Sequence, residues 1–232
     1  MSTLIHLPVF GLALTLGAYL GAYWLYHRLG RPGVLSPVLV TTAIVATVLL
    51  LTGLPYAVYL EQVSLLTMLL GPATVALALP LLRNGRALTS SAPAVTAALV
   101  AGGVLSIAIT VGVLTLFGAG DDVLLAALPR SVTSPVGLSI AESLQASVPL
   151  AVVLTMVSGV LGAAFGPALL TLARVRDERA RGFAVGLTSN GIGTSRVLDE
   201  SSVAGGWSSA AMVLNALVMT IVLPIVAAVV TG

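Results

Sequence analysis

The chain has 232 residues, of which 58% are hydrophobic and only 8% are charged, and its formal net charge is +2. A soluble domain carries about 25% charged residues, so this composition indicates a protein of the lipid bilayer. The absence of cysteine excludes disulfides, thiolate metal sites and a cysteine nucleophile, and no basic tract is long enough to bind nucleic acid.

Six apolar stretches are predicted to cross the membrane, which requires roughly 20 apolar residues per helix. The first stretch is too long for the core of a signal peptide and is kept as a span. A Gly-Pro pair in the third stretch is expected to kink that helix. The predicted spans are residues 4–25, 37–54, 63–82, 92–117, 148–173 and 207–230, with 56–62 as a short outside loop.

The charged loops predict the orientation of these spans, because cytoplasmic loops carry an excess of Arg and Lys. Aromatic residues cluster at the far end of the first span and are followed by Arg28 and Arg31, which places the N-terminus outside. The loop 174–181 carries four Arg and two acidic residues and is assigned to the inside. Asp121 and Asp122 are assigned to the outside, so one net crossing, by 148–173, lies between these loops.

Two re-entrant helical hairpins are expected in addition to the spans. The stretch 123–146 must enter and leave the membrane on one side, and irregular backbone is tolerated there only where protein or water satisfies it. A second hairpin near 182–204 is favoured because Asn-Gly-Ile-Gly would break a lipid-facing helix, although a crossing by 182–198 remains open. Hairpins entering from opposite faces suggest an inverted repeat. The direct sequence evidence for it is the pair of Gly-Pro-Ala triplets at 71–73 and 166–168.

We therefore expect an all-α polytopic membrane protein in which residues 1–232 form a single domain. Within it, 1–62 are predicted to be scaffold or dimer helices and 63–232 a substrate-carrying core. Gly17 and Gly21 form a Gly-x-x-x-Gly motif that permits close helix contact. We expect a homodimer built on these early spans.

The first polar stretch is residues 130–135, Arg-Ser-Val-Thr-Ser-Pro. Ser134 is a favoured N-cap and Pro135 a favoured first helical residue, so a half-helix is expected to run from 135 to about 144. Its free N–H groups would face Ser131 and Thr133, and Arg130 adds a permanent positive charge. This combination predicts an anion site.

The second polar stretch is residues 189–196, Ser-Asn-Gly-Ile-Gly-Thr-Ser-Arg. Gly191 and Gly193 permit a positive φ and a close approach of the backbone to a ligand. Thr194 is expected to cap the helix that carries Ser195 and Arg196, and consecutive N–H groups there are expected to form an anion nest. Asn190 offers both a donor and an acceptor.

Each of these groups has a structural alternative. Ser and Thr in membrane helices often only join neighbouring helices, and Arg130 and Arg196 would then pair with Glu142 and Asp199 or reach the headgroups. Glu142 and Asp199 are also the candidates for coupling transport to an ion. His6 and His27 lie at span ends and are interpreted as interfacial. No metal-ligand spacing or catalytic constellation is present, so we expect neither an enzyme, a metal site nor a cofactor.

Four motifs resemble those of the LrgB/CidB family of bacterial membrane proteins, over residues 70–226. They are Gly-Pro-Ala-Thr-Val-Ala-Leu-Ala at 71–78, the stretch 130–135, Gly-Ile-Gly-Thr-Ser-Arg at 191–196 and Ser-Ser-Ala-Ala-Met-Val-Leu-Asn at 208–215. Three positions depart from the family pattern. Asn190 stands where a His is usual, Gln145-Ala146 stands where Gly-Gly is usual, and Asp199 stands where Glu is common.

The resemblance implies two kinds of function. Some members are holin/antiholin-like proteins that control murein hydrolase export and cell lysis, while others resemble carriers of small carboxylates such as pyruvate, glycolate and glycerate. We favour a monocarboxylate transporter of the bacterial inner membrane, in which Arg130, Arg196 and the hydroxyls of the two polar stretches hold the anion. The alternatives are the holin-like role and a scaffold for a small LrgA-type partner.

Overall fold

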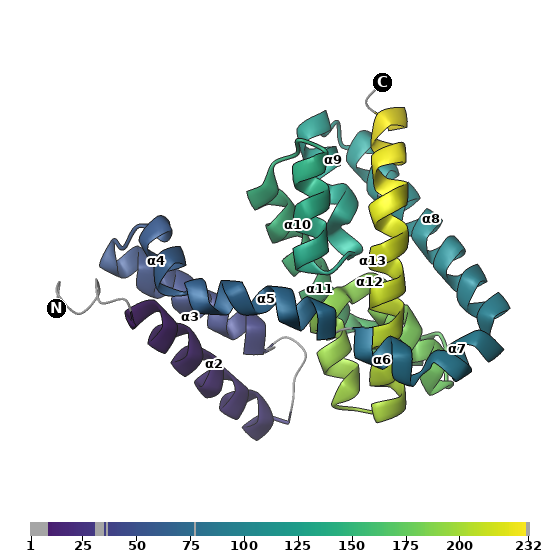
Figure 1. Cartoon of the computed structure of the whole chain (residues 1–232), viewed down its shortest axis with the longest axis horizontal. Helices are drawn as coiled ribbons and strands as arrows, with labels where there is room; N and C mark the ends of the chain where they lie inside the picture. The colour runs from purple at the N-terminus through teal and green to yellow at the C-terminus, as the bar shows by residue number, and fades with distance from the viewer. Residues whose placement is uncertain (1–8, 31–34, 36, 77, 231–232) are drawn as a thin grey trace. The chain divides into compact units, whose positions relative to one another are not determined.

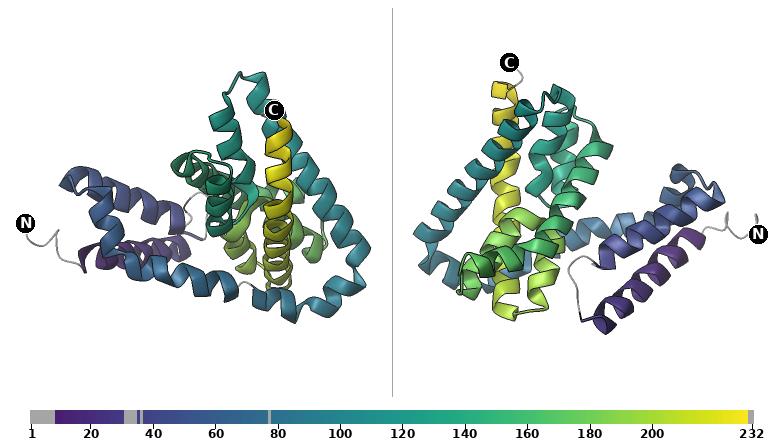
Figure 2. Two further views of the ribbon diagram at one scale, coloured as in Figure 1. Left: turned by 45° about the horizontal axis from the view of Figure 1, so that its top comes forward. Right: turned by 180° about the vertical axis from the view of Figure 1, so that it is seen from behind.

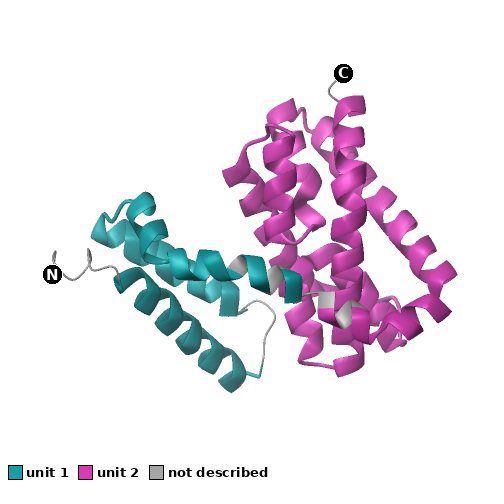
Figure 3. Cartoon of the chain, viewed as in Figure 1, with its two compact units in different colours: residues 1–76 teal, residues 77–232 magenta. Residues whose placement is uncertain are grey.

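The computed structural model describes residues 9–30, 35, 37–76 and 78–230, and every regular element in these residues is a helix (Figure 1). The chain divides into two compact units, residues 1–76 and 77–232 (Figure 3). This boundary lies further along the chain than the division at 62/63 that we expected between scaffold and core.

The first unit contains α2 (Phe10–Arg28), α3 (Pro37–Thr52), α4 (Tyr56–Gln62) and α5 (Ser64–Ala76). Residues 56–62, expected as a short outside loop, form the helix α4. Two polar contacts join α4 to α2. Gln62 Oε1 accepts a hydrogen bond from the Gly11 N–H at 3.0 Å, and the Tyr59 and Thr15 hydroxyls are 2.8 Å apart. Helix α5 continues past Pro72 and ends at Ala76.

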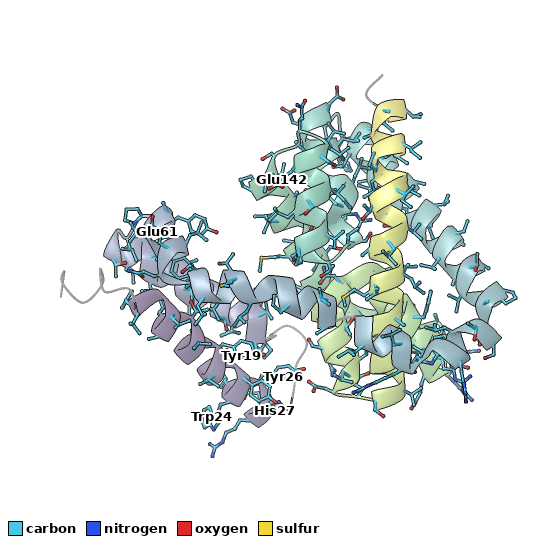
Figure 4. The ribbon with its side chains drawn as sticks, viewed as in Figure 1. Tyr19, Trp24, Tyr26, His27, Glu61 and Glu142 are labelled. Carbon is cyan, nitrogen blue, oxygen red and sulfur yellow. The ribbon has the colours of Figure 1, made fainter. Side chains whose placement is uncertain are left out.

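Aromatic side chains gather at the C-terminal end of α2, where Figure 4 labels Tyr19, Trp24, Tyr26 and His27. The Arg28 guanidinium lies 4.8 Å from the ring centre of Trp24. Such a cluster of amphipathic rings beside a cation is typical of a helix end at the membrane surface. No atom lies within 4 Å of a Cβ built on Gly17 or Gly21, so that face of α2 is open within this unit.

The second unit contains three helices that are long and apolar enough to cross a membrane, among the residues described. These helices are α8 (Ala92–Leu116), α11 (Val148–Leu172) and α13 (Ser202–Val230). They correspond to the last three predicted spans, and large apolar side chains such as Leu116, Leu172 and Val229 are exposed along them. The short helices α6 (Ala78–Arg83) and α7 (Gly85–Ser90) precede α8.

Hairpin 1 consists of α9 (Asp121–Ala127), the 3₁₀ turn η2 (Leu128–Ser131) and α10 (Ser134–Ser143). Its two arms share the same buried clusters, since Ala126 and Ala141 belong to one cluster and Leu128 and Ile140 to another. Extended backbone at Val132 and Thr133 reverses the chain between the arms. Thr133 is the N-cap of α10, so the prediction of Ser134 as the cap is wrong by one residue.

Hairpin 2 is α12 (Glu178–Leu198), which is broken at Asn190 (φ 45°, ψ −147°). Val185 and Val197 share one buried cluster, whereas a straight helix would hold them about 18 Å apart. A Cβ on Gly193 would lie 2.8 Å from Val185 Cγ1, which also shows that the second arm folds back on the first. Both arms end at one level, because Ser201 Oγ donates to Glu178 Oε2 at 2.8 Å.

The two hairpins enter the second unit from opposite ends (Figures 1 and 2). Hairpin 1 begins at Asp121 and Asp122, and we call this end acidic; the far part of α13, at Ala227, packs near its first arm. Hairpin 2 begins beside the loop that carries Arg174, Arg176 and other Arg residues, and we call this end basic. The turns of both hairpins therefore lie inside the unit and away from its ends.

Candidate substrate site at the hairpin turns

Arg130 lies in the turn of hairpin 1 and is held by α8. Its Nε donates to Thr110 Oγ1 at 2.7 Å, and its Nη2 donates to the Ser106 carbonyl at 3.4 Å. In the described part of the chain, Nη1 of Arg130 has no hydrogen-bond partner, and no carboxylate forms an ion pair with the guanidinium. The proposed structural pair with Glu142 is therefore not formed, and the guanidinium retains donors for a ligand.

Three hydroxyls surround the same turn. Ser131 is buried, and Thr133 and Ser134 are half-buried. Within residues 9–30, 37–76 and 78–230, none of their Oγ atoms has a hydrogen-bond partner, although most other Ser and Thr hydroxyls of the unit donate to a helix carbonyl. Unused hydroxyls beside a cation at the start of α10 have the composition of an anion site.

Asn215, in the middle of α13, joins the two hairpins. Its Nδ2 donates to the Ser131 carbonyl of hairpin 1 at 3.1 Å and to the Leu187 carbonyl of hairpin 2 at 3.2 Å. The side chain is only 1% exposed. One buried amide therefore links the turn of hairpin 1 to the first arm of hairpin 2, just before its break at Asn190.

Asn190 forms the turn of hairpin 2 and is 3% exposed. Its Nδ2 donates to the Thr155 carbonyl of α11 at 3.2 Å, and its Oδ1 accepts from the Ile192 N–H at 3.1 Å. Thr155 Oγ1 in turn lies 3.7 Å from a Cβ built on Gly137 of hairpin 1. Helix α11 therefore lies against both turns, and the Asn190 side chain is used within the protein.

The remaining polar residues of the second stretch serve the packing of hairpin 2. Positive φ occurs at Asn190 and not at Gly191 or Gly193, so the prediction for the two glycines is wrong. Gly193 is needed for space instead, because a Cβ there would collide with Ser189.

Thr194 is not the cap of the second arm, because Asn190 caps it. Thr194 Oγ1 instead bonds the Asn190 carbonyl and Ser208 Oγ, each at 2.8 Å. Ser195 Oγ donates to the Ile192 carbonyl.

Arg196 lies further along the second arm and forms an ion pair with Glu200, with 2.9 Å between Nη2 and Oε1. Glu142 projects from α10 to the surface of the second unit (Figure 4). Asp199 is exposed at the C-cap of α12. The structure therefore brings Arg130, Ser131, Thr133 and Ser134 together, and it places Glu142 and Asp199 at the surface.

Sequence reasoning missed four residues that build this centre: Thr110, Thr155, Ser208 and Asn215. Asn215 carried a usable signal, since an amide within an apolar span is expensive to bury and marks a site by default. The Thr and Ser hydroxyls carried none, because such residues are common in membrane helices as packing contacts. No group of three or more His, Cys, Asp or Glu side chains able to hold a metal ion lies in the described residues.

The fold and this centre define a multi-pass helical membrane protein with polar groups gathered between long apolar helices. The chain belongs to the LrgB-like family, whose model matches residues 15–229. The resemblance inferred from the four sequence motifs is thereby confirmed.

Relatives span nearly the whole chain. YwbG and YxaC of Bacillus subtilis are each 34% identical to it, over 90% and 92% of this chain and 92% of each relative. The holin-like protein CidB of Staphylococcus aureus is 28% identical over 91% of this chain and 92% of the relative. No solved structure matches the chain.

Proposed function

We propose that this protein transports small monocarboxylates of the pyruvate, glycolate or glycerate type across the bacterial cytoplasmic membrane. The observation that carries the proposal is the pairing of two opposed helical hairpins whose turns are joined by Asn215 beside a partly buried Arg130. Secondary transporters commonly place their substrate at such broken helices, near the middle of the bilayer. The two hairpins are re-entrant segments in this proposal.

The substrate carboxylate binds at hairpin 1 in this proposal. Arg130 supplies the charge, and the hydroxyls of Ser131, Thr133 and Ser134 supply hydrogen bonds, since none of them is used within the described protein. Hairpin 2 contributes the N-terminus of its second arm at Gly191. We assign no charge recognition to Arg196, because Glu200 already neutralises it.

We further propose an inverted repeat, the arrangement that many alternating-access transporters use. We pair α8 and hairpin 1 with α11 and hairpin 2, since α8 and α11 both have 25 residues and align without a gap at an offset of 56. A residue of positive φ stands two positions after the end of each helix, Gly118 after α8 and Arg174 after α11. Eight aligned positions are identical. The pairs are Pro93 and Pro149, Gly103 and Gly159, Val104 and Val160, Leu105 and Leu161, Ala108 and Ala164, Leu114 and Leu170, Thr115 and Thr171, and Leu116 and Leu172. This pairing does not use the Gly-Pro-Ala triplets at 71–73 and 166–168, which lie in different units.

Uptake of labelled pyruvate and glycolate into liposomes that contain this chain alone tests the proposal. Saturable uptake with counterflow is expected, and Arg130→Ala should reduce it by about tenfold or more, because a hydrogen bond to a charged group contributes about 1.5–3 kcal/mol. Arg86→Ala, at an exposed Arg of the same unit, is the matched control and should retain uptake. Equal uptake by Arg130→Ala and Arg86→Ala would contradict the assignment of the site.

A holin-like role is the second candidate, and the name of the Staphylococcus aureus relative favours it. A holin-like protein would release an unrelated dye from the same liposomes, and Arg130→Ala would change the size of its oligomers and not a substrate flux.

We further propose a homodimer through the open Gly17 and Gly21 face and a small LrgA-type partner. Crosslinking at Gly17 and Gly21 tests the dimer, and co-reconstitution with an LrgA-type protein tests the partner.

A further inference from the structure

A cavity of about 610 Å³ lies between α8 and the first arm of hairpin 2. Its walls are mostly apolar, formed by residues such as Ala94, Ala98, Phe183 and Ala184. Ser91, Asp177 and Arg179 line it at the basic end, where α8 and hairpin 2 both begin. Gly102, Leu187 and Thr188 line it where these helices approach the hairpin turns.

The inner end of the cavity adjoins the candidate substrate site. Along α8, Gly102 is followed one turn later by Ser106 and two turns later by Thr110, and residues four apart are neighbours on a helix surface. Ser106 and Thr110 are the two residues that hold Arg130. On the opposite wall, the Leu187 carbonyl accepts the hydrogen bond from Asn215.

Leu187 lines the inner end of the cavity and contacts Gly102 of α8. Its Cδ2 rests on the Gly102 backbone so closely that a Cβ at position 102 would collide with it. The leucine side chain is 7% exposed and is the flexible partner in this contact, because Gly102 belongs to the long helix α8. Leu187 therefore stands between the last cavity-lining residue of α8, Gly102, and the residues one and two turns further along α8 that hold Arg130.

We infer that this cavity is the route by which the transported carboxylate reaches Arg130 from the basic end, and that Leu187 is the gate at its inner end. The inference rests on the proposed transport function. The charge of the entrance suits an anion: Arg179 lines it beside Asp177, and the adjoining loop 174–181 carries four Arg against two acidic residues. The apolar walls and the volume suit a short aliphatic carboxylate, which needs only part of this space.

Cysteine labelling tests the route, because the natural chain contains no cysteine. Single cysteines are placed at Ala98 in the cavity, at Ser106 beyond the gate and at Val104, which is 62% exposed and outside the cavity. A negatively charged, membrane-impermeant methanethiosulfonate is applied from either side of sealed vesicles, and labelling of Arg176→Cys identifies the basic side. Ala98→Cys should react from the basic side alone, and Val104→Cys, which faces lipid, should not react.

The gate is tested by combining Ser106→Cys with Leu187→Ala or with the more conservative Leu187→Val. From the basic side, Ser106→Cys should react at least tenfold faster when Leu187 is shortened, and pyruvate should slow that reaction. Fluorescence of the buried Trp207 establishes that each variant is folded. Equal rates with and without the Leu187 substitution, or no reaction at Ala98→Cys, would overturn the inference.

The labelling result does not depend on the transport assay. Arg130→Ala should reduce uptake by about tenfold or more and leave the labelling of Ala98→Cys unchanged. Shortening Leu187 could speed the labelling of Ser106→Cys while pyruvate neither slows that reaction nor is taken up. That result would overturn the carboxylate function, and with it the route assigned to the carboxylate. Uptake that persists while Ala98→Cys stays unreactive would overturn the route alone.

Discussion

Gln145 has a left-handed backbone (φ 54°) directly after α10, and it is exposed. Two hydrogen bonds close the helix end around it: the Ala146 N–H to the Ala141 carbonyl at 2.9 Å, and the Gln145 N–H to the Glu142 carbonyl at 3.1 Å. This is a Schellman motif, whose left-handed position is usually Gly. The family resemblance pointed to Gly-Gly at this position. The left-handed backbone explains this preference, because glycine adopts that conformation without strain.

Gln145→Gly is therefore expected to stabilise the protein by about 0.5–1 kcal/mol, since the left-handed strain outweighs the added entropy of the unfolded chain. The expected gain in melting temperature is about 1–3 °C in detergent, followed by Trp207 fluorescence. Gln145→Ala keeps the strain and should show no gain. An equal rise for both substitutions would mean that the backbone conformation is not the cause.

Asn215→Ala is expected to destabilise the second unit by about 2–4 kcal/mol, because it leaves the Ser131 and Leu187 carbonyls without their donor. Thermal unfolding measures the change. Thr220→Ala, on the same helix, removes an exposed hydroxyl that bonds only the Ala216 carbonyl and should change stability by less than about 0.5 kcal/mol. Similar effects from the two substitutions would show that Asn215 does not join the hairpins.

At the scale of helices, the first arm of hairpin 2 is held to α13 through small residues. Cβ atoms on Gly182 and Gly186 would collide with the backbone carbonyls of Ala204 and Ser208. Both pairs are four residues apart, so two small-xxx-small faces meet, as membrane helices often do where their backbones approach closely. Sequence reasoning examined the Gly17 and Gly21 pair, which faces open space, and passed over this one.

Gly186→Ala is expected to destabilise the protein by about 1–3 kcal/mol, because a methyl group cannot fit between two backbones without moving a helix. The matched control is Gly112→Ala in α8, where no atom lies within 4 Å and the better helix former should be neutral or stabilising. Melting temperatures of the two variants in one detergent measure the difference. If Gly186→Ala were as stable as the control, the close packing would be refuted.

At the scale of the whole molecule, the second unit has acidic residues at one end and many Arg residues at the other. Cytoplasmic loops favour Arg, so we expect the basic end inside. Ser147→Cys, beside hairpin 1, should react with an impermeant thiol reagent only from outside the cell, and Arg176→Cys only from inside. Labelling of both cysteines from one face would rule out this orientation.

Much of the fold could be predicted from hydropathy. Ala92–Leu116, Val148–Leu172 and Ser202–Val230 were expected as spans within a few residues at most boundaries, because long apolar runs bounded by polar loops allow few other structures. Turns were placed less well. Three local features depended on contacts with distant residues, such as the bond from Asn190 to Thr155. They are the helix cap at Thr133, the helix break at Asn190 and the helix Tyr56–Gln62.

The candidate site shows the same division. Arg130 and the hydroxyls beside it could be chosen from the sequence, because a cation, unused hydroxyls and a helix start are local features of residues 130–135. The sequence could not separate them from Arg196 and Thr194, which have the same local chemistry. In the structure, Glu200 one helical turn further on pairs with Arg196, and Ser208 of α13 bonds Thr194.

The sequence alone determined that this is a helical membrane protein of the LrgB-like family and where its long apolar helices lie. These properties follow from composition, from the length of apolar runs and from contiguous motifs. The tertiary structure alone decided that Asn215 joins the two hairpins, that Arg130 keeps spare donors and that Leu187 lines the inner end of the cavity. Each of these depends on contacts between residues far apart in the chain, and no local pattern encodes which distant partner a polar group will meet.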